Sequence, residues 1–392
     1  MTKAIYIVDD EPGVLATVSF VLRRHDPEWN VTGFTKPVDA IAAVRQMAPH
    51  LVLADQTMPG MTGSQMLDVI RGIAPQAVRI IISAHASQTD KIGSAHQYLS
   101  KPFDHRELPN RIQQALDAQE SLSNPGFTSL VTSLQSFPAL PAVYTDLLRE
   151  LDGDDSAFEQ TAALLDKDGG IFTRTIQMAN SPLFGGTRPI TRSSEALLQL
   201  GTSNVKALVL SLHVFHGYNQ INFPEMPVEM VWHRSWQTAQ LARELSRKEL
   251  GEAAANDAFF AGLVRDLGCL ILMENHTERY KEVCQRAARE HRPLIEVEKQ
   301  VFEASHADLS GFMLRLWGMP EAVIDAVIHC DAPWNGPRGN EFTPTVALYM
   351  ANILSRQQNP PDTFIIPELE RSYLASVGAP DIRDLEESKT RP

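Results

Sequence analysis

Cysteine and long apolar runs are both scarce in this chain of 392 residues. The three cysteines, Cys269, Cys284 and Cys330, form no C-x-x-C pair, so we expect buried thiols in a reducing compartment rather than a disulfide framework. No uninterrupted apolar run approaches the roughly 20 residues that a membrane-spanning helix needs. The apolar run Ala4–Val8 is too short for a signal peptide. These absences predict a cytoplasmic protein without a membrane anchor.

Positive charge is also in deficit. The chain has 35 Lys and Arg residues against 48 Asp and Glu residues, which gives a formal net charge of −13. An acidic total disfavours a nucleic-acid-binding surface, although a local basic patch can exist within it. Residues 193–212 have a helix–glycine–helix pattern loosely like a helix-turn-helix, but they carry only Lys206 as a cation besides the preceding Arg188 and Arg192. That is too little charge to neutralise several phosphates, so DNA binding is disfavoured.

Two kinds of periodic pattern follow one another along the chain. Up to about residue 120, short apolar runs alternate with helical patterns in five βα units, which predicts a flavodoxin-like, doubly wound, five-stranded parallel sheet. From Phe127 onward helical periodicity dominates, and the breaker Asn124-Pro125-Gly126 marks the expected boundary. We therefore expect an α/β domain over residues 1–122, a linker over 123–128, an all-α domain over 129–385 and a disordered tail over 386–392.

Polar side chains stand where the predicted strands end. Asp9 and Asp10 close the first strand, and Asp55 closes the third. Ser83 closes the fourth strand, and Lys101 follows the fifth. In a flavodoxin-like strand order these ends meet at one edge of the sheet. Three carboxylates there repel one another unless a hard divalent cation such as Mg²⁺ joins them. Because the Lys101 ammonium can offset further negative charge, the edge suits a phosphoryl group on Asp55.

These residues lie in motifs that resemble a response-regulator receiver domain of the CheY-like family, across residues 1–120. The matching motifs are I-V-D-D-E-P at 7–12, D-Q-T-M-P-G-M-T-G at 55–63, S-A at 83–84 and Y-L-S-K-P-F at 98–103. The resemblance implies that Asp55 accepts a phosphoryl group from a sensor histidine kinase or a phosphotransfer protein. It also implies a Mg²⁺ ion held by Asp9, Asp10, Asp55 and the backbone carbonyl of Gln56.

The same resemblance assigns a switch to Ser83 and Tyr98, in which the hydroxyl moves toward the phosphate while the aromatic ring turns inward. Ser83 and Lys101 are expected to contact the phosphoryl group. The Lys101–Pro102 peptide bond is expected to be cis, and cis bonds are essentially a proline phenomenon.

Two features depart from the usual receiver pattern. The segment between Ser83 and Lys101 is short, so the fourth helix, expected at Gln88–Ala95, must be stubby. Pro109 lies early in the last helix, where it either starts the regular part or kinks it. Both features fall on the face that receivers normally use for dimerisation and output, so the usual output surface is not expected to be intact.

The second half resembles an HDOD domain, a helical output module of bacterial signalling proteins, from about Leu130 to about Leu385. The signature motifs are A-N-S-P-L-F-G at 179–185 and A-L-L-Q-L-G at 196–201. The remaining matches are W-H at 232–233, D-L-G at 266–268, S-H at 305–306, L-W-G-M-P-E at 316–321 and H-C at 329–330. The resemblance implies an all-α signalling domain behind the receiver domain.

HDOD domains are related to the HD superfamily of metal-dependent phosphohydrolases, which hold a metal with histidines and an adjacent His-Asp pair to activate water. The corresponding positions in this chain are His233, Arg265-Asp266, His306 and His329, and a late aspartate is replaced by Asn352. A guanidinium cannot ligate a metal, so we expect Arg265 to pair with Asp266 in place of the ion. The remaining histidines are then expected to be partly buried, hydrogen-bonded helix residues.

We therefore expect a response regulator in which phosphorylation of Asp55 switches a non-catalytic HDOD domain that acts through protein–protein contacts. Its downstream partner is not specified by the sequence, and homodimerisation is left open. The alternative is a receiver-gated, metal-dependent HD-type phosphohydrolase acting on a cyclic dinucleotide or another nucleotide. The Gly-Tyr-Pro tripeptide of active cyclic-dinucleotide hydrolases is not found in the chain, which disfavours this alternative.

Overall fold

The computed structural model describes residues 2–83, 91–92, 95–101, 106–138, 140, 144, 161–163, 165–166, 169–181, 183–184, 189–358 and 365–380. Contacts divide the chain into two compact units. Unit 1 comprises Met1–Ala142, Ile271–Thr277 and Glu298–Met319, and unit 2 comprises Val143–Leu270, Glu278–Val297 and Pro320–Pro392. Segments 271–277 and 298–319, expected within the all-α domain, thus cluster with the amino-terminal part of the chain.

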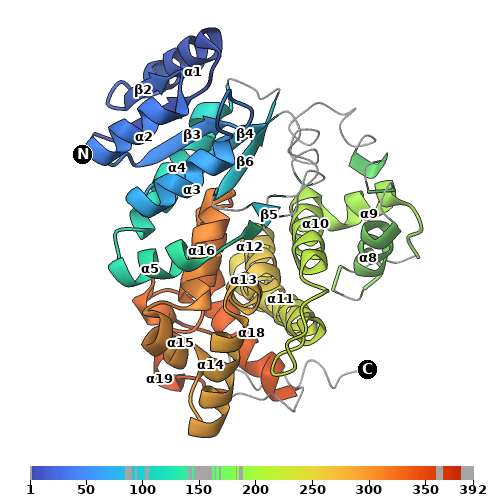
Figure 1. Ribbon diagram of the computed structural model, residues 1–392. Coiled ribbons are helices and arrows are strands. Elements are labelled where there is room, and N and C mark those ends of the chain that lie inside the picture. The colour runs from blue at the N-terminus through green and yellow to red at the C-terminus, as the bar shows by residue number, and fades with distance from the viewer. Residues whose placement is uncertain are drawn as a thin grey trace. The chain divides into compact units, whose positions relative to one another are not determined.

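Unit 1 contains a five-stranded sheet (Figure 1). Its strands are β1 (Ala4–Val8), β2 (Asn30–Phe34), β3 (Leu51–Asp55), β4 (Val78–Ser83) and β6 (Gln97–Ser100). They lie in the order β2-β1-β3-β4-β6, and every neighbouring pair is parallel. Strands β1, β3 and β4 are buried along their whole length, as expected for a parallel sheet with helices on both faces. The predicted flavodoxin-like fold of this part is confirmed.

Four helices flank this sheet. They are α1 (Pro12–His25), α2 (Pro37–Gln46), α3 (Gly63–Ile73) and α4 (Leu108–Ser121). Helices α2 and α3 pack against each other over a core that includes Tyr6, Val52 and Ile81, while α1 contacts α4 (Figure 1). The start of α3 is fixed by a capping box, in which Thr62 and Gln65 each accept a hydrogen bond from the other's backbone N–H. This capping box fixes the end of the loop that follows β3.

The region of the expected fourth helix differs from the prediction. Most of Gln88–Ala95 lies outside the described residues, and the residues described there are not helical. Lys91–Ile92 form strand β5, which pairs antiparallel with β7 (Phe137–Pro138). The helical prediction is wrong for these two residues, because pairing with a distant strand overrides a local pattern. Pro109 lies in the first turn of α4, where its missing N–H breaks no helical bond, so it starts this helix.

The remainder of unit 1 is helical. It contains α5 (Pro125–Ser133), α16 (His306–Leu316) and the ends of α13 (Leu267–Asn275) and α15 (Leu294–Phe302). Helix α5 begins inside the expected linker, because the side chain of Asn124 accepts hydrogen bonds from the N–H groups of Gly126 and Phe127. Helix α16 packs against α4. Just beyond α16, Gly318 has a φ of 70°, a left-handed conformation that favours glycine.

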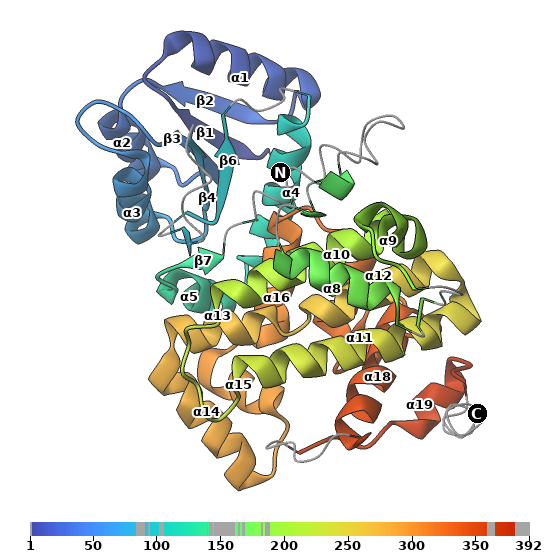
Figure 2. The same cartoon turned by 90° about the vertical axis from the view of Figure 1, so that its right-hand side faces the viewer.

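Unit 2 is helical in its described parts, which confirms the predicted all-α region. Its elements are α8 (Gly169–Ala179), α9 (Ser193–Leu200), α10 (Thr202–Gly217), α11 (Val228–Leu250), α12 (Glu252–Val264), α14 (Thr277–Glu290), α17 (Glu321–His329), the 3₁₀ helix η2 (Pro333–Asn335), α18 (Pro344–Gln358) and α19 (Arg371–Ser376). The long helix α11 packs against α12 and α18 (Figure 2). Helices α11 and α12 can approach closely because Gly262 has no side chain. A Cβ at this position would lie only 2.4 Å from the Cα of Ala239.

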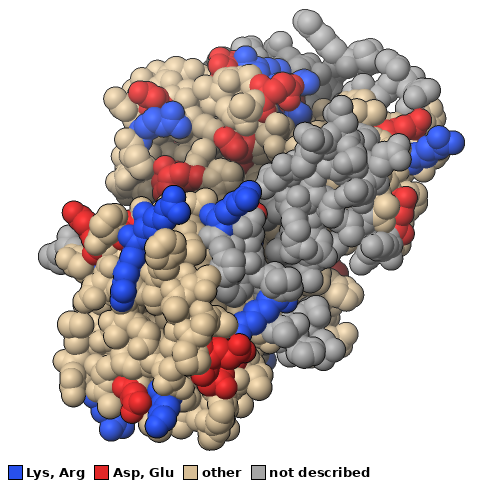
Figure 3. Space-filling view, turned by 90° about the horizontal axis from the view of Figure 1, so that it is seen from above, with Lys and Arg blue, Asp and Glu red and all other residues tan. Residues whose placement is uncertain are grey.

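Within the described parts of the chain, no helix combines the length and apolarity needed to cross a bilayer. Charged side chains of both signs lie in small groups on the described surface seen in Figure 3. That face therefore offers no broad basic area among its described residues, of the kind that a nucleic-acid backbone would need.

Candidate functional site

Asp55 is the last residue of β3 and is 7% exposed. One of its carboxylate oxygens, Oδ1, lies 2.5 Å from the Nζ of Lys101. The other, Oδ2, accepts a hydrogen bond from the backbone N–H of Thr57 at 2.7 Å. The carboxylate is thus fixed at the carboxyl end of the strand, with one oxygen on a cation and the other on the loop.

Asp9 follows β1 and is 2% exposed. Its Oδ2 lies 3.2 Å from the Nζ of Lys101, and its Oδ1 accepts the backbone N–H of Glu11 at 2.9 Å. The same ammonium therefore contacts two carboxylates. Burial alone would lower the pKa of Lys101, but hydrogen bonds and charge attraction from Asp55 and Asp9 outweigh it, and the pKa is raised. Asp10, the other predicted carboxylate, follows Asp9 in the sequence, and its side chain is exposed.

The two residues predicted to form the switch, Ser83 and Tyr98, lie on the neighbouring strands β4 and β6. Ser83 ends β4 and is nearly buried, and its backbone carbonyl accepts the N–H of Lys101 at 2.8 Å. Tyr98 lies in β6 opposite Ile81 of β4 and is partly buried against the core cluster. The structure thus brings Asp9, Asp55 and Lys101 into contact at one edge of the sheet. The predicted cis bond to Pro102 lies outside the described residues.

Gln56 is more tightly tied than the sequence suggested. Its backbone carbonyl accepts the N–H of Gly63 at 3.0 Å, and its side-chain oxygen accepts the N–H and the hydroxyl of Ser64 at 3.2 and 2.9 Å. A Cβ on Gly63 would lie 2.3 Å from the backbone oxygen of Asp55. Gly63 and Ser64 therefore shape the loop, and the T-G-S-Q sequence at 62–65 was the only signal for this role.

The donor groups at this edge fit a hard divalent cation. Asp9 and Asp55 are buried carboxylates that share one ammonium, so this pair and Lys101 together carry one net negative charge. Carboxylate and carbonyl oxygens are the ligands that Mg²⁺ prefers. The predicted ligands are Asp9, Asp10, Asp55 and the backbone carbonyl of Gln56, and the structure brings Asp9 and Asp55 together on the ammonium of Lys101.

A second carboxylate cluster lies in unit 2, around Asp266. The Oδ2 of Asp266 lies 3.1 Å from the Nη2 of Arg234, and Oδ1 lies 3.3 Å from the Nε of Arg265. The hydroxyl of Ser235 donates to Oδ2 at 3.4 Å. The expected pairing of Arg265 with Asp266 is present, together with a second arginine that the sequence analysis missed.

His233 does not join this cluster, although its sequence position suggested it. Val231 and Ser235 face the core of unit 2, and His233 is exposed. His233 lies two residues from each of them. Because two residues correspond to about 200° around a helix, His233 lies on the side of α11 away from the core. Arg234 approaches Asp266 instead. The positions of the apolar residues along α11 could have indicated from the sequence that Arg234, rather than His233, faces Asp266.

Arg265 is buried among anionic and polar groups of unit 2. Burial alone would lower its pKa, but the charge of Asp266, with a further contribution from Asp331, raises it above its ordinary value. Asn352 donates to Asp331 at 3.4 Å. His329, the last residue of α17, is half-buried. Arg265 thus remains a permanent cation in the position expected for the first member of a His-Asp pair.

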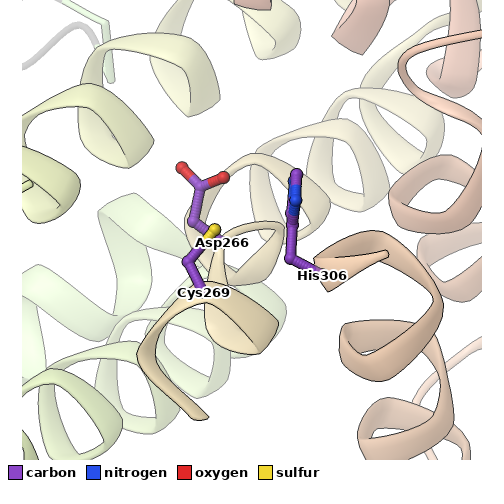
Figure 4. Close-up of side chains that lie close together, drawn as sticks. All are labelled: Asp266, Cys269 and His306. Carbon is purple, nitrogen blue, oxygen red and sulfur yellow. The ribbon is translucent and has the colours of Figure 1, made fainter. Parts of the chain in front are cut away.

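His306 belongs to unit 1, at the start of α16. Its Nδ1 lies 2.6 Å from the Oε2 of Glu298, and its backbone N–H donates to the same oxygen at 3.0 Å. Both side chains are buried. Figure 4 shows His306 at the start of α16, Asp266 just before α13 and Cys269 in the first turn of α13. Glu298, which orients the imidazole, was not identified from the sequence because it lies eight residues away on another helix.

Comparisons with known proteins match both halves of the chain. A model of the HDOD domain matches residues 137–333, and a model of the response regulator receiver domain matches residues 5–113. A solved HDOD domain protein with unknown function from Geobacter sulfurreducens has a TM-score of 0.52 and 18% identity, covering 72% of this chain and 95% of that chain. At this identity the likeness shows the fold alone.

Two curated relatives cover different shares of the chain. The transcriptional regulatory protein CssR of Bacillus subtilis (strain 168) is 34% identical over 121 residues, which are 30% of this chain and 52% of CssR. An uncharacterized protein of Treponema pallidum (strain Nichols) is 21% identical over 229 residues, which are 58% of this chain and 44% of that protein. The chain thus spans about half the length of the curated relatives it matches.

Proposed function

This chain belongs to the HDOD family and carries a response regulator receiver domain, and we propose that phosphorylation of Asp55 switches its HDOD domain. The observation that carries the proposal is the contact of Asp9 and Asp55 with the single ammonium of Lys101. A lone aspartate at a strand end is compatible with an ordinary turn. Two buried carboxylates held by one lysine lie at the carboxyl edge of a parallel sheet, where open α/β sheets carry their chemistry, and this supports a phosphoacceptor role for Asp55.

In the proposed reaction, a carboxylate oxygen of Asp55 attacks the phosphorus of a donor phosphohistidine. A P–O bond forms, the P–N bond breaks, and its electron pair leaves with the donor imidazole. The Nζ of Lys101, which now contacts Asp55, donates to the phosphoryl oxygens. Asp9, Asp10, Asp55 and the carbonyl of Gln56 would hold Mg²⁺, whose charge offsets that of the phosphoryl group. The donor is a sensor histidine kinase or a phosphotransfer protein.

The aspartyl phosphate biases the receiver between two states. The Ser83 hydroxyl, at the end of β4, hydrogen-bonds a phosphoryl oxygen and moves toward it. The Tyr98 ring, which is partly buried, turns into the space that this movement opens. The two residues lie on neighbouring strands whose register pairs Ser83 with Ser100 and Ile81 with Tyr98.

The HDOD domain acts in this proposal without hydrolysing a substrate. Its Asp266 carboxylate is already contacted by the guanidiniums of Arg234 and Arg265, which repel a metal ion. Output then consists of contacts with a downstream signalling protein or a second copy of the chain. The buried free thiols of Cys269, Cys284 and Cys330 support a cytoplasmic location.

The switch is tested on the full chain with beryllofluoride and Mg²⁺, which together mimic the aspartyl phosphate. Light scattering and small-angle X-ray scattering should report a change in oligomeric state or domain arrangement in the wild type. Asp55→Asn should show no change, and Asp39→Asn, which removes a carboxylate from α2, should behave like the wild type. An equal response of wild type and Asp55→Asn, or no response of either, contradicts the proposal.

Metal content separates this proposal from the phosphohydrolase alternative. Protein purified without chelator should retain well below one transition-metal ion per chain, because two arginines contact Asp266. A tightly held ion that is lost on mutation of Asp266 would instead favour a receiver-gated HD-type phosphohydrolase.

A further inference from the structure

The amino-terminal edge of the sheet, opposite the edge that carries Asp55, holds a second buried polar cluster. Arg79, the second residue of strand β4, has no exposed surface. Its Nη1 donates to the carbonyls of Pro75 and Ala77 at 3.3 and 2.9 Å, and its Nη2 lies 2.8 Å from the Nε2 of His96. Burial, with a contribution from the positive charge of Arg71, lowers the pKa of Arg79 to about 9.

His96 immediately precedes β6 and is also fully buried. The backbone N–H of Arg79 donates to its Nδ1 at 3.2 Å, and its own N–H donates to the carbonyl of Arg79 at 2.7 Å. The starts of β4 and β6 are therefore tied together. The opposite ends of the same two strands carry Ser83 and Lys101, so both strands connect the proposed switch to this pair.

The imidazole of His96 also contacts two aromatic rings edge-on. Its centroid lies 4.9 Å from that of Phe137 in β7 and 5.7 Å from that of Phe312 in α16. Phe312 makes a further edge contact with Phe127 of α5, at 5.6 Å. All four rings are nearly or fully buried. In such close packing the ring of His96 cannot move without displacing its neighbours.

Helix α16 lies within the HDOD match, yet it packs in unit 1 with the receiver. It packs against α4, and the Nη1 of Arg315 lies 3.5 Å from the hydroxyl of Ser121, the last residue of that helix. Its first residue, His306, is paired with Glu298. One continuous helix therefore joins a receiver contact, Phe312, to a residue of the degenerate HD motif.

We propose that α16 is the element through which the receiver controls the HDOD domain, with His96 as the positioning residue that carries movement of β6 to Phe312. The inference rests on the proposed function. Tyr98 lies in β6 only two residues after His96, which immediately precedes that strand, so a shift of β6 that accompanies the inward turn of Tyr98 also moves the imidazole. Because packed cores switch between discrete arrangements, movement of the imidazole shifts Phe312 to a new packing position, and α16 moves with it.

Amide hydrogen exchange on the full chain, with and without beryllofluoride and Mg²⁺, tests this route. In the wild type, exchange should change both in residues 51–63 around Asp55 and in residues 306–316 of α16, the latter by about fivefold or more, the low end of typical allosteric coupling. Phe312→Leu should keep the response of 51–63 and lose that of 306–316. His96→Leu should give the same result. If His96→Leu does not fold, Phe312→Leu still tests the route, because it leaves the Arg79–His96 pair intact.

Phe34→Leu is the matched control, because it removes an edge-on contact with Tyr6 in the receiver and should leave both responses intact. An unchanged α16 response in Phe312→Leu overturns the inference. A wild-type response confined to residues 51–63 also overturns it but leaves the proposed function standing. If residues 51–63 of the wild type do not respond, the proposed function fails and the inference fails with it.

Discussion

Two buried carboxylate clusters of this chain have opposite charge balances. In the receiver, Asp9 and Asp55 share the single ammonium of Lys101, which leaves one net negative charge. In the HDOD domain, the single carboxylate of Asp266 contacts the guanidiniums of Arg234 and Arg265, which leaves one net positive charge. We propose that this charge balance favours a divalent cation at the receiver cluster and disfavours one at Asp266.

The largest expected effect concerns the receiver cluster. Asp55→Asn should reduce phosphate incorporation from a small-molecule phosphodonor to below about 1% of the wild-type rate, since loss of a nucleophile typically costs several orders of magnitude. Asp39→Asn should retain the wild-type rate. The measurement is acid-labile, base-labile phosphate bound per chain, and retained labelling in Asp55→Asn would move the phosphoacceptor to another residue and break the comparison.

The HDOD cluster should respond in stability. Arg265→Ala should lower the free energy of unfolding by about 3 kcal/mol, the lower end for breaking a buried ion pair, because Arg234 still contacts Asp266. Arg286→Ala removes an exposed partner of Glu290 and should cost less than about 1 kcal/mol. Urea denaturation measures both. Equal effects would show that Arg265 does not stabilise the Asp266 charge.

The backbone around Asp55 should tolerate little change. Gly63→Ala should destabilise the receiver by about 1–3 kcal/mol, because its Cβ would meet the Asp55 carbonyl. Gly72→Ala is the matched control in the same helix, since a Cβ there meets nothing within 4 Å. It should stabilise by about 0.5–1 kcal/mol through helix propensity. Thermal denaturation decides, and a neutral Gly63→Ala would show that the loop after Asp55 can relax.

A smaller effect should appear in the pH dependence of stability. Burial and the charge of Arg79 hold the pKa of His96 well below 6.5 in the folded chain. The unfolded chain therefore binds a proton near pH 6.5 that the folded chain does not bind, and stability falls as the pH drops below about 6.5. One such group contributes a slope of up to about 1.4 kcal/mol per pH unit.

His96→Gln isolates this contribution, because it removes the titrating group and keeps a polar side chain. Below about pH 6.5, the free energy of unfolding of this variant should fall less steeply than that of the wild type. Parallel pH profiles would show that His96 binds its proton equally in the folded and unfolded chain and would contradict a neutral imidazole buried beside the Arg79 cation.

The convergence of Asp9, Asp55 and Lys101 was accessible from the sequence. Each follows a short apolar run, and in a doubly wound parallel sheet the carboxyl ends of such strands meet. The register of β3, β4 and β6 then places Ser83 and Tyr98 on neighbouring strands. Local pattern and a single topological rule were enough for this edge of the sheet.

The second cluster was only partly accessible. The sequence showed that Arg265 precedes Asp266, and pairing of such neighbours needs no long-range information. The exchange of His233 for Arg234 depends on the rotation of α11, which is set by the packing of Val231 and Ser235. The pairing of Glu298 with His306 depends on the turn between two helices.

By itself, the sequence determined the order of the five strands of the parallel sheet along the chain and the residues that end them, because these follow from local periodicity. Tertiary structure alone decided that Lys91–Ile92 pair with β7, that Arg79 and His96 are buried together, and that α16 packs in unit 1. These features join segments far apart in the chain. The packing energy of such contacts outweighs local propensity, so they cannot be predicted from a local sequence pattern.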